Sequence, residues 1–198
     1  MSIAIWPNNP CPKSKRELQI MRQILIALAT ISLLTGPVSA QTKSRPVPGF
    51  GGYSEITDPF EKPDANLRYK IVFDVAQAAR TPSTVHQGLE RVARMVNLLS
   101  HYGVTLRPGD IVVTLHGPAA RTTLTEKAFS AKFDGEANPN AELIRQLTMA
   151  GVSVRLCGQS MVVMGVTREE LNPDVRVDVS AITTIGTLQM RGYSVIQD

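Results

Sequence analysis

Residues 110–116, with the sequence DIVVTLH, restrict the possible folds more than any other stretch of this chain. The run is nearly continuous in apolar side chains, which is typical of a strand that is buried on both faces. Turn signals bound it on either side, Pro108-Gly109 before it and Gly117-Pro118 after it. Strands of this kind occur in parallel sheets that helices cover on both faces. We therefore expect an α/β fold.

The remainder of residues 68–198 alternates short strands with amphipathic helices. The other expected strands span residues 68–75, 152–157, 175–179 and 193–196. The expected helices span residues 86–102, 120–129, a stretch from a cap at Asn138 to Gly151, 160–164 and 181–191, the last with Ile182, Ile185 and Leu188 inward. This alternation predicts parallel strands joined by right-handed crossovers, with helices on both faces of the sheet.

The first 40 residues have the three parts of a secretory signal. A short basic start at Met21-Arg22 precedes an apolar run over residues 24–34, and Val38-Ser39-Ala40 offers a cleavage site. We expect cleavage after Ala40 and a periplasmic mature protein without a membrane anchor. Two alternatives stay open: an uncleaved N-terminal anchor, and Met21 in place of Met1 as the true start.

Residues 41–67 are rich in proline and glycine and are expected to form an extended arm before the domain of residues 68–198. Three aromatic residues, Phe50, Tyr53 and Phe60, are unusual in a free linker. They favour packing on the domain or on a neighbouring subunit, and a disordered tether is the alternative.

The net charge of +4 is concentrated in the predicted signal segment, which holds Lys13, Lys15, Arg16, Arg22 and Glu17. Removing those four basic residues and one acidic residue from totals of 21 and 17 leaves 17 and 16, a net charge of +1. A nearly neutral domain gives no electrostatic reason to expect a nucleic-acid partner.

Three reactive side chains close different strands of the predicted sheet: Asp74, His116 and Cys157. The carboxyl ends of parallel strands share one edge, where α/β sheets bind ligands. Cys157 precedes Gly158 and a helix start, which favours the thiolate, so we interpret Cys157 as a nucleophile with His116 as its proton partner.

The structural alternatives are a small buried Cys157, a His116 that bonds backbone, and an Asp74 that caps a loop. Cys157 is the only cysteine left after signal cleavage, because Cys11 is removed with the signal. A lone thiol in an oxidising compartment favours a functional role.

Several common motifs are missing from the sequence: CxxC, the Walker loop, GxGxxG and GxSxG. His86, expected at a helix start, could in principle bind a metal together with His116 and Cys157. These three residues lack the close spacing typical of metal ligands, so they are weak evidence for a metal site. We expect no cofactor and no metal.

Residues 68–197 resemble the DsrE/DsrF-like family, which includes sulfur-relay subunits. The resemblance is carried by YKIVFDVAQ, GLERVARMVNL, IVVTLHG, NPNAELIRQLTMAGVSVRLCGQS and SAITTIGTLQMRGYSVI. It implies a three-layer α/β/α fold with a parallel, roughly five-stranded sheet, and a homo-oligomer, trimer or hexamer. It also implies a cysteine that carries sulfur as a persulfide, and Cys157 is the matching position.

Two functions follow as expectations. In the first, the protein is a periplasmic sulfur carrier or sulfurtransferase, whose Cys157 exchanges sulfur with a small molecule or a partner protein thiol. In the second, it is a non-catalytic oligomeric protein that binds a small ligand, and Cys157 has no chemical role.

Overall fold

The computed structural model describes residues 45–197. The predicted signal segment and its cleavage site after Ala40 lie outside these residues and stay predictions. Within residues 45–197, no helix has the length and apolar character that crossing a membrane requires. The elements are β1 (Ile71–Val75), α2 (Gln87–His101), β2 (Ile111–Leu115), the 3-10 helix η1 (Gly117–Thr123), α3 (Glu126–Lys132), α4 (Ala141–Met149), β3 (Ser153–Cys157), α5 (Gly158–Met164), the 3-10 helix η2 (Arg168–Glu170), β4 (Arg176–Asp178), α6 (Ala181–Met190) and β5 (Ser194–Gln197).

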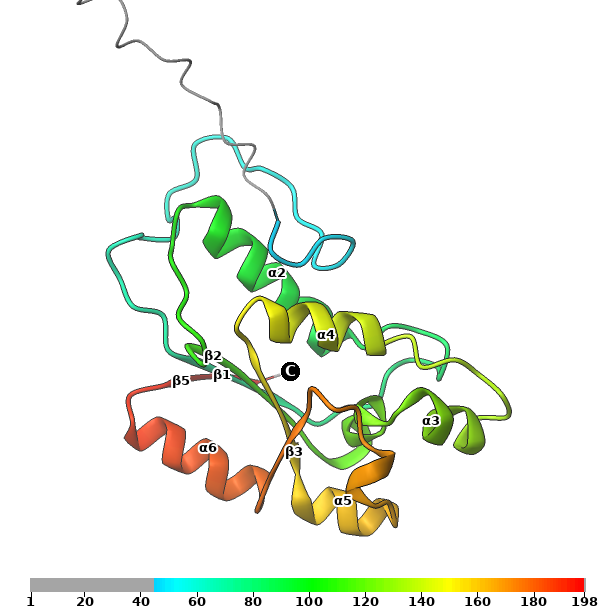
Figure 1. Ribbon diagram of the computed structural model, residues 1–198. Coiled ribbons are helices and arrows are strands. Elements are labelled where there is room, and N and C mark those ends of the chain that lie inside the picture. Colours follow the sequence, from blue (N-terminus) through cyan, green and yellow to red (C-terminus); the bar gives the residue numbers. More distant parts are fainter. Residues whose placement is uncertain (1–44, 198) are drawn as a thin grey trace, which may run out of the picture. The chain divides into compact units, whose positions relative to one another are not determined.

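The five strands form one parallel sheet in the order β4-β3-β2-β1-β5. Helices α2 and α4 cover one face and α6 covers the other, so the domain has three layers (Figure 1). All five residues of β2, the central strand, are buried, as the apolar run over residues 110–116 predicts. The expected α/β fold class is confirmed.

Alternate residues of the strands supply two separate cores. Phe73 and Val113 point to the side of α2 and α4, where they join the largest apolar cluster. Val72 and Val112 point the other way and pack with Leu188 of α6. Each fully buried side chain of this size contributes about 1.5–3 kcal/mol, so both faces stabilise the sheet.

The single helix expected over residues 120–129 is divided into two, η1 and α3, with a break at Leu124 and Thr125. The hydroxyls of Thr122 and Thr123 bond carbonyls three residues earlier, and these bonds accompany the tight turns of η1. Leu124 then forms an isolated antiparallel bridge. Thr125 caps a new helix, α3, by accepting a bond from a backbone N–H of its first turn. The threonines divide the segment because their side chains compete for backbone groups.

The cap expected at Asn138 is also wrong by two residues. Asn140 is the residue before α4, and its side-chain oxygen accepts a bond of 2.7 Å from the backbone N–H of His86. Asn138 is buried, and its amide donates to the carbonyls of Thr122, in η1, and Leu124, just after it. Both asparagines therefore join segments that are distant in sequence.

Ile182, expected inward, is 84% exposed. The residues of α6 that are buried are Ala181, Thr184 and Leu188. These positions are separated by three and four residues and share one side of the helix, which leaves Ile182 on another side.

The described part of the predicted arm packs against α2. Val47 is fully buried, and the side chain of Asn97 bonds its backbone N–H and carbonyl. Gly51 has a positive φ of 60°, and a Cβ there would lie 2.3 Å from the backbone nitrogen of Arg94, so only glycine permits this approach. Phe60, by contrast, is fully exposed.

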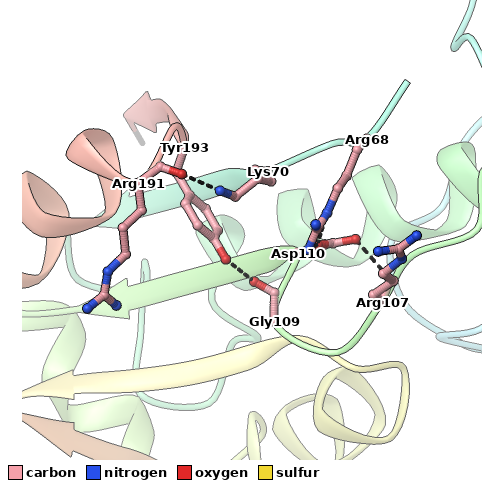
Figure 2. A network of polar contacts seen from close by, with 7 residues as sticks. All are labelled: Arg68, Lys70, Arg107, Gly109, Asp110, Arg191 and Tyr193. Atoms are coloured by element: carbon pink, nitrogen blue, oxygen red, sulfur yellow. Dashed lines mark hydrogen bonds and ion pairs between the residues drawn. The ribbon is translucent and has the colours of Figure 1, made fainter. Parts of the chain in front are cut away.

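Polar contacts fix the amino edge of the sheet (Figure 2). The buried carboxylate of Asp110 accepts bonds from the Arg68 guanidinium and from the backbone N–H of Arg107. The Tyr193 hydroxyl donates to the Gly109 carbonyl at 2.8 Å, and Lys70 lies over the Tyr193 ring. These contacts join the starts of β1, β2 and β5, opposite to the edge that holds the reactive side chains.

Candidate functional site

Cys157 is the last residue of β3 and directly precedes α5. Its register partner is Asp178 of β4, whose carboxylate accepts a bond of 2.8 Å from Thr184 of α6. Paired residues of parallel strands share a face, so Cys157 lies on the α6 side of the sheet. The residue is 5% exposed.

The starts of two helices converge on the thiol. Ala181 is the first residue of α6, and Gln159 and Ser160 lie in the first turn of α5. Burial raises the pKa of the Cys157 thiol, but the N–H groups of these three residues and the Ser160 hydroxyl lower it by more, and the net pKa is lowered. The neutral thiol makes no regular capping bond to α5. An ionised sulfur attracts the same donors more strongly.

Gly158 lets the ends of β3 and β4 approach each other. A Cβ at this position would lie 2.6 Å from the carbonyl oxygen of Asp178. Any side chain would therefore push away the segment that leads into Ala181 and its N–H group. The glycine after the cysteine is required for this packing, and through it for the electrostatic environment of the sulfur.

Ser160 connects the thiol to the neighbouring strand. Its Oγ accepts a bond of 2.9 Å from the backbone N–H of Gly117, which directly follows His116. With that lone pair occupied, the hydroxyl hydrogen is free to face Cys157. The sequence places Ser160 at a helix start, and we expected no role for it. The signal that could have identified it is its spacing: Ser160 is three residues after Cys157, the residue that precedes α5, and side chains at this spacing often contact each other at a helix start.

His116 contacts Asp74. It is not among the groups that interact with the Cys157 sulfur. Nε2 of His116 lies 2.7 Å from Oδ1 of Asp74. Because a carboxylate only accepts, Nε2 is the donor, and in the neutral ring Nδ1 is then the acceptor nitrogen. Both side chains are partly exposed, 29% and 23%. Leu115 and Leu156, the residues before His116 and Cys157, are register partners, so His116 and the thiol lie at the ends of neighbouring strands. Asp74 lies one strand further along the sheet, in β1.

A second polar pair balances the charge of the carboxylate beside Cys157. Arg155 Nη1 lies 3.4 Å from Asp178 Oδ2. An uncompensated carboxylate next to a thiol disfavours the thiolate. The Arg155–Asp178 ion pair therefore offsets a negative charge that would otherwise raise the pKa of the thiol, against the effect of the two helix starts.

His86 has a structural role at the start of α2. Its Nδ1 accepts a bond from the backbone N–H of Gly88, and its Nε2 bonds the carbonyl of Gln77 at 2.7 Å. Both ring nitrogens are engaged. In the described part of the chain, no group of three or more His, Cys, Asp or Glu side chains is placed to hold a metal ion.

Comparison with known proteins agrees with this architecture. The sequence model of the DsrE/DsrF-like family matches residues 56–197. The chain belongs to the DsrE/DsrF-like family. No match was found among curated proteins.

Two solved structures are similar to this member of the family. The first is a protein of unknown function, MTH1491 from Methanobacterium thermoautotrophicum, with 18% identity and a TM-score of 0.50 over 66% of this chain and 99% of that chain. The second is the ychN protein from E. coli, with 18% identity and a TM-score of 0.47 over 65% of this chain and 98% of that chain. At this identity, the likeness to MTH1491 shows the fold alone.

Proposed function

We propose that the protein is a sulfur carrier, or a sulfurtransferase-like protein, in which Cys157 accepts sulfane sulfur as a persulfide and passes it to a thiol. The observation that supports this most is the position of the thiol at two helix starts, which lower its pKa. Among residues 45–197, Cys157 is the one cysteine. A persulfide on it has no internal thiol in the described domain to resolve it, which suits a carrier better than a disulfide oxidoreductase.

The chemistry needs no external oxidant or reductant. The Cys157 thiolate attacks the sulfane sulfur of a donor, a new S–S bond forms, and the donor's leaving group departs with the electron pair of the broken bond. In the second step an acceptor thiolate attacks the outer sulfur. The Cys157 thiolate is then released, and the acceptor holds the persulfide.

The His116–Asp74 dyad suits the proton transfer that this exchange requires. Asp74 holds Nε2 and orients the ring, which leaves Nδ1 to accept a proton. In this proposal, the proton comes from the acceptor thiol when it arrives at the carboxyl edge of the sheet. His116 thereby prepares the acceptor, and the helix starts prepare Cys157.

Intact-mass measurement tests the proposal. We expect the mature protein to gain one sulfur atom after treatment with polysulfide or thiosulfate, and to lose it on addition of an acceptor thiol. The Cys157→Ser variant should gain none. A wild-type protein that keeps its mass under all these donors would contradict the proposal and leave the ligand-binding function.

A further inference from the structure

A groove runs along α5 on the side that faces η1 and α3. One part of it, about 410 Å³, is lined by residues that include Pro118, Arg121, Ser160 and Met164. The second part, about 380 Å³, shares Arg121 and Met164 and extends to Lys132. We call the two parts together the α5 groove.

The charges that line the α5 groove have one sign. Arg121 and Lys132 are cationic, and none of its lining residues is acidic. Lys132 donates to the Met164 carbonyl at 3.5 Å, and the Arg121 guanidinium lies over the Phe133 ring. Within residues 45–197, Arg121 makes no ion pair. An anion in the groove would therefore find a guanidinium with no competing carboxylate.

Much of the remaining groove wall is apolar, and one end reaches Ser160, which lies beside the buried Cys157. Pro118, Val163 and Met164 supply the apolar surface, and Val163 is 87% exposed. Ser160 lines the groove, and its hydroxyl also interacts with the Cys157 sulfur. A ligand with an apolar body and an anionic sulfur group would match the groove along its length.

We propose that the α5 groove binds the sulfur donor, and that the donor is a small organic anion such as a thiosulfonate. This inference rests on the sulfur-carrier function proposed above. The guanidinium of Arg121 binds the sulfonyl oxygens, the apolar body lies on Val163 and Met164, and the sulfane sulfur faces Cys157.

The transfer step balances for this donor. The Cys157 thiolate attacks the outer sulfur of R–SO₂–S⁻, the new S–S bond forms on Cys157, and the S–SO₂ bond breaks. The products are the Cys157 persulfide anion and the sulfinate R–SO₂⁻, which leaves with the electron pair. Arg121 thus contacts the group on which the leaving charge develops.

The test uses benzenethiosulfonate as donor and follows the sulfur gained by intact mass. We expect Arg121→Gln to lower the second-order rate constant by about tenfold, the range of a charge-assisted hydrogen bond. Arg121→Lys should restore part of the loss. Arg168→Gln removes an exposed arginine of η2 that does not line the groove, and it should react like the wild type. Alkylation by neutral iodoacetamide should be equal in all four proteins.

A second measurement separates the groove from the carrier function. Benzenesulfinate, the unreactive product, should bind Cys157→Ser in titration calorimetry and bind the double variant with Arg121→Gln at least severalfold more weakly. Sulfur uptake at equal rates in wild type and Arg121→Gln, with no sulfinate binding, would overturn the groove and leave the carrier standing. Sulfinate binding that needs Arg121, with no sulfur uptake from any donor, would support the anion groove and overturn the carrier.

Discussion

Replacing Ser160 with alanine tests how the fold controls the thiol. The hydroxyl of Ser160 interacts with the Cys157 sulfur while its oxygen is held by the Gly117 N–H. A hydrogen bond to a charged group contributes about 1.5–3 kcal/mol, and a large, diffuse thiolate belongs at the lower end. A loss of about 1.4 kcal/mol lowers an ionisation constant about tenfold. We therefore expect Ser160→Ala to raise the pKa of Cys157.

The rate of alkylation should change in opposite directions at low and high pH. Below both pKa values the thiolate fraction falls about tenfold, while the nucleophilicity of each thiolate rises about threefold with a Brønsted coefficient of about 0.4–0.5. The observed rate with iodoacetamide should thus fall about three- to fourfold. Above both pKa values only the second effect is left, so the variant should react about threefold faster.

The assay is the pH profile of iodoacetamide alkylation for wild type, Ser160→Ala, Ser160→Thr and Ser180→Ala. Ser160→Thr keeps a hydroxyl and should lie close to the wild type. Ser180 precedes α6 and its side chain makes no capping bond, so it is a matched control near the same sulfur. Superimposed profiles for Ser160→Ala and wild type would refute the role of the hydroxyl.

Two further substitutions test the packing around the site and the start of α2. Gly158→Ala should lower the free energy of unfolding by about 1–3 kcal/mol in urea titration, because its Cβ meets the Asp178 carbonyl at 2.6 Å. Gly186→Ala, whose Cβ meets nothing within 4 Å, is the control and should stabilise the protein by about 0.5–1 kcal/mol. Equal effects of the two substitutions would contradict the role of Gly158 in packing. Burial lowers the pKa of His86, so the neutral ring stabilises the fold above the ordinary pKa of 6.5, and this stability is lost as the pH falls below 6.5. His86→Asn should therefore reduce the decrease of the urea midpoint below pH 6.5. An unchanged slope would show that other groups cause the decrease.

The fold class followed from local patterns of the sequence. The apolar run over residues 110–116 predicts a strand buried on both faces, and the structure buries every residue of β2. Helix periodicity located α2 and its buried face because amphipathic spacing is a local property, whereas for α6 it located the helix but placed Ile182 on the wrong side. The same local reasoning failed over residues 120–129, since threonine side chains there bond backbone groups and interrupt the helix.

The sequence by itself also placed Asp74, His116 and Cys157 at one edge of the sheet, because strand ends and parallel order follow from local pattern and crossover rules. Which side chains touch was decided only by the tertiary structure. His116 bonds Asp74, whereas the thiol contacts Ser160 and Ala181. Ala181 lies 24 positions after Cys157 in the chain. The start of α6 arrives at Cys157 because β4 pairs with β3 and Gly158 permits their close approach. Contacts between segments so distant in sequence depend on strand order and backbone clearance, which no local pattern records.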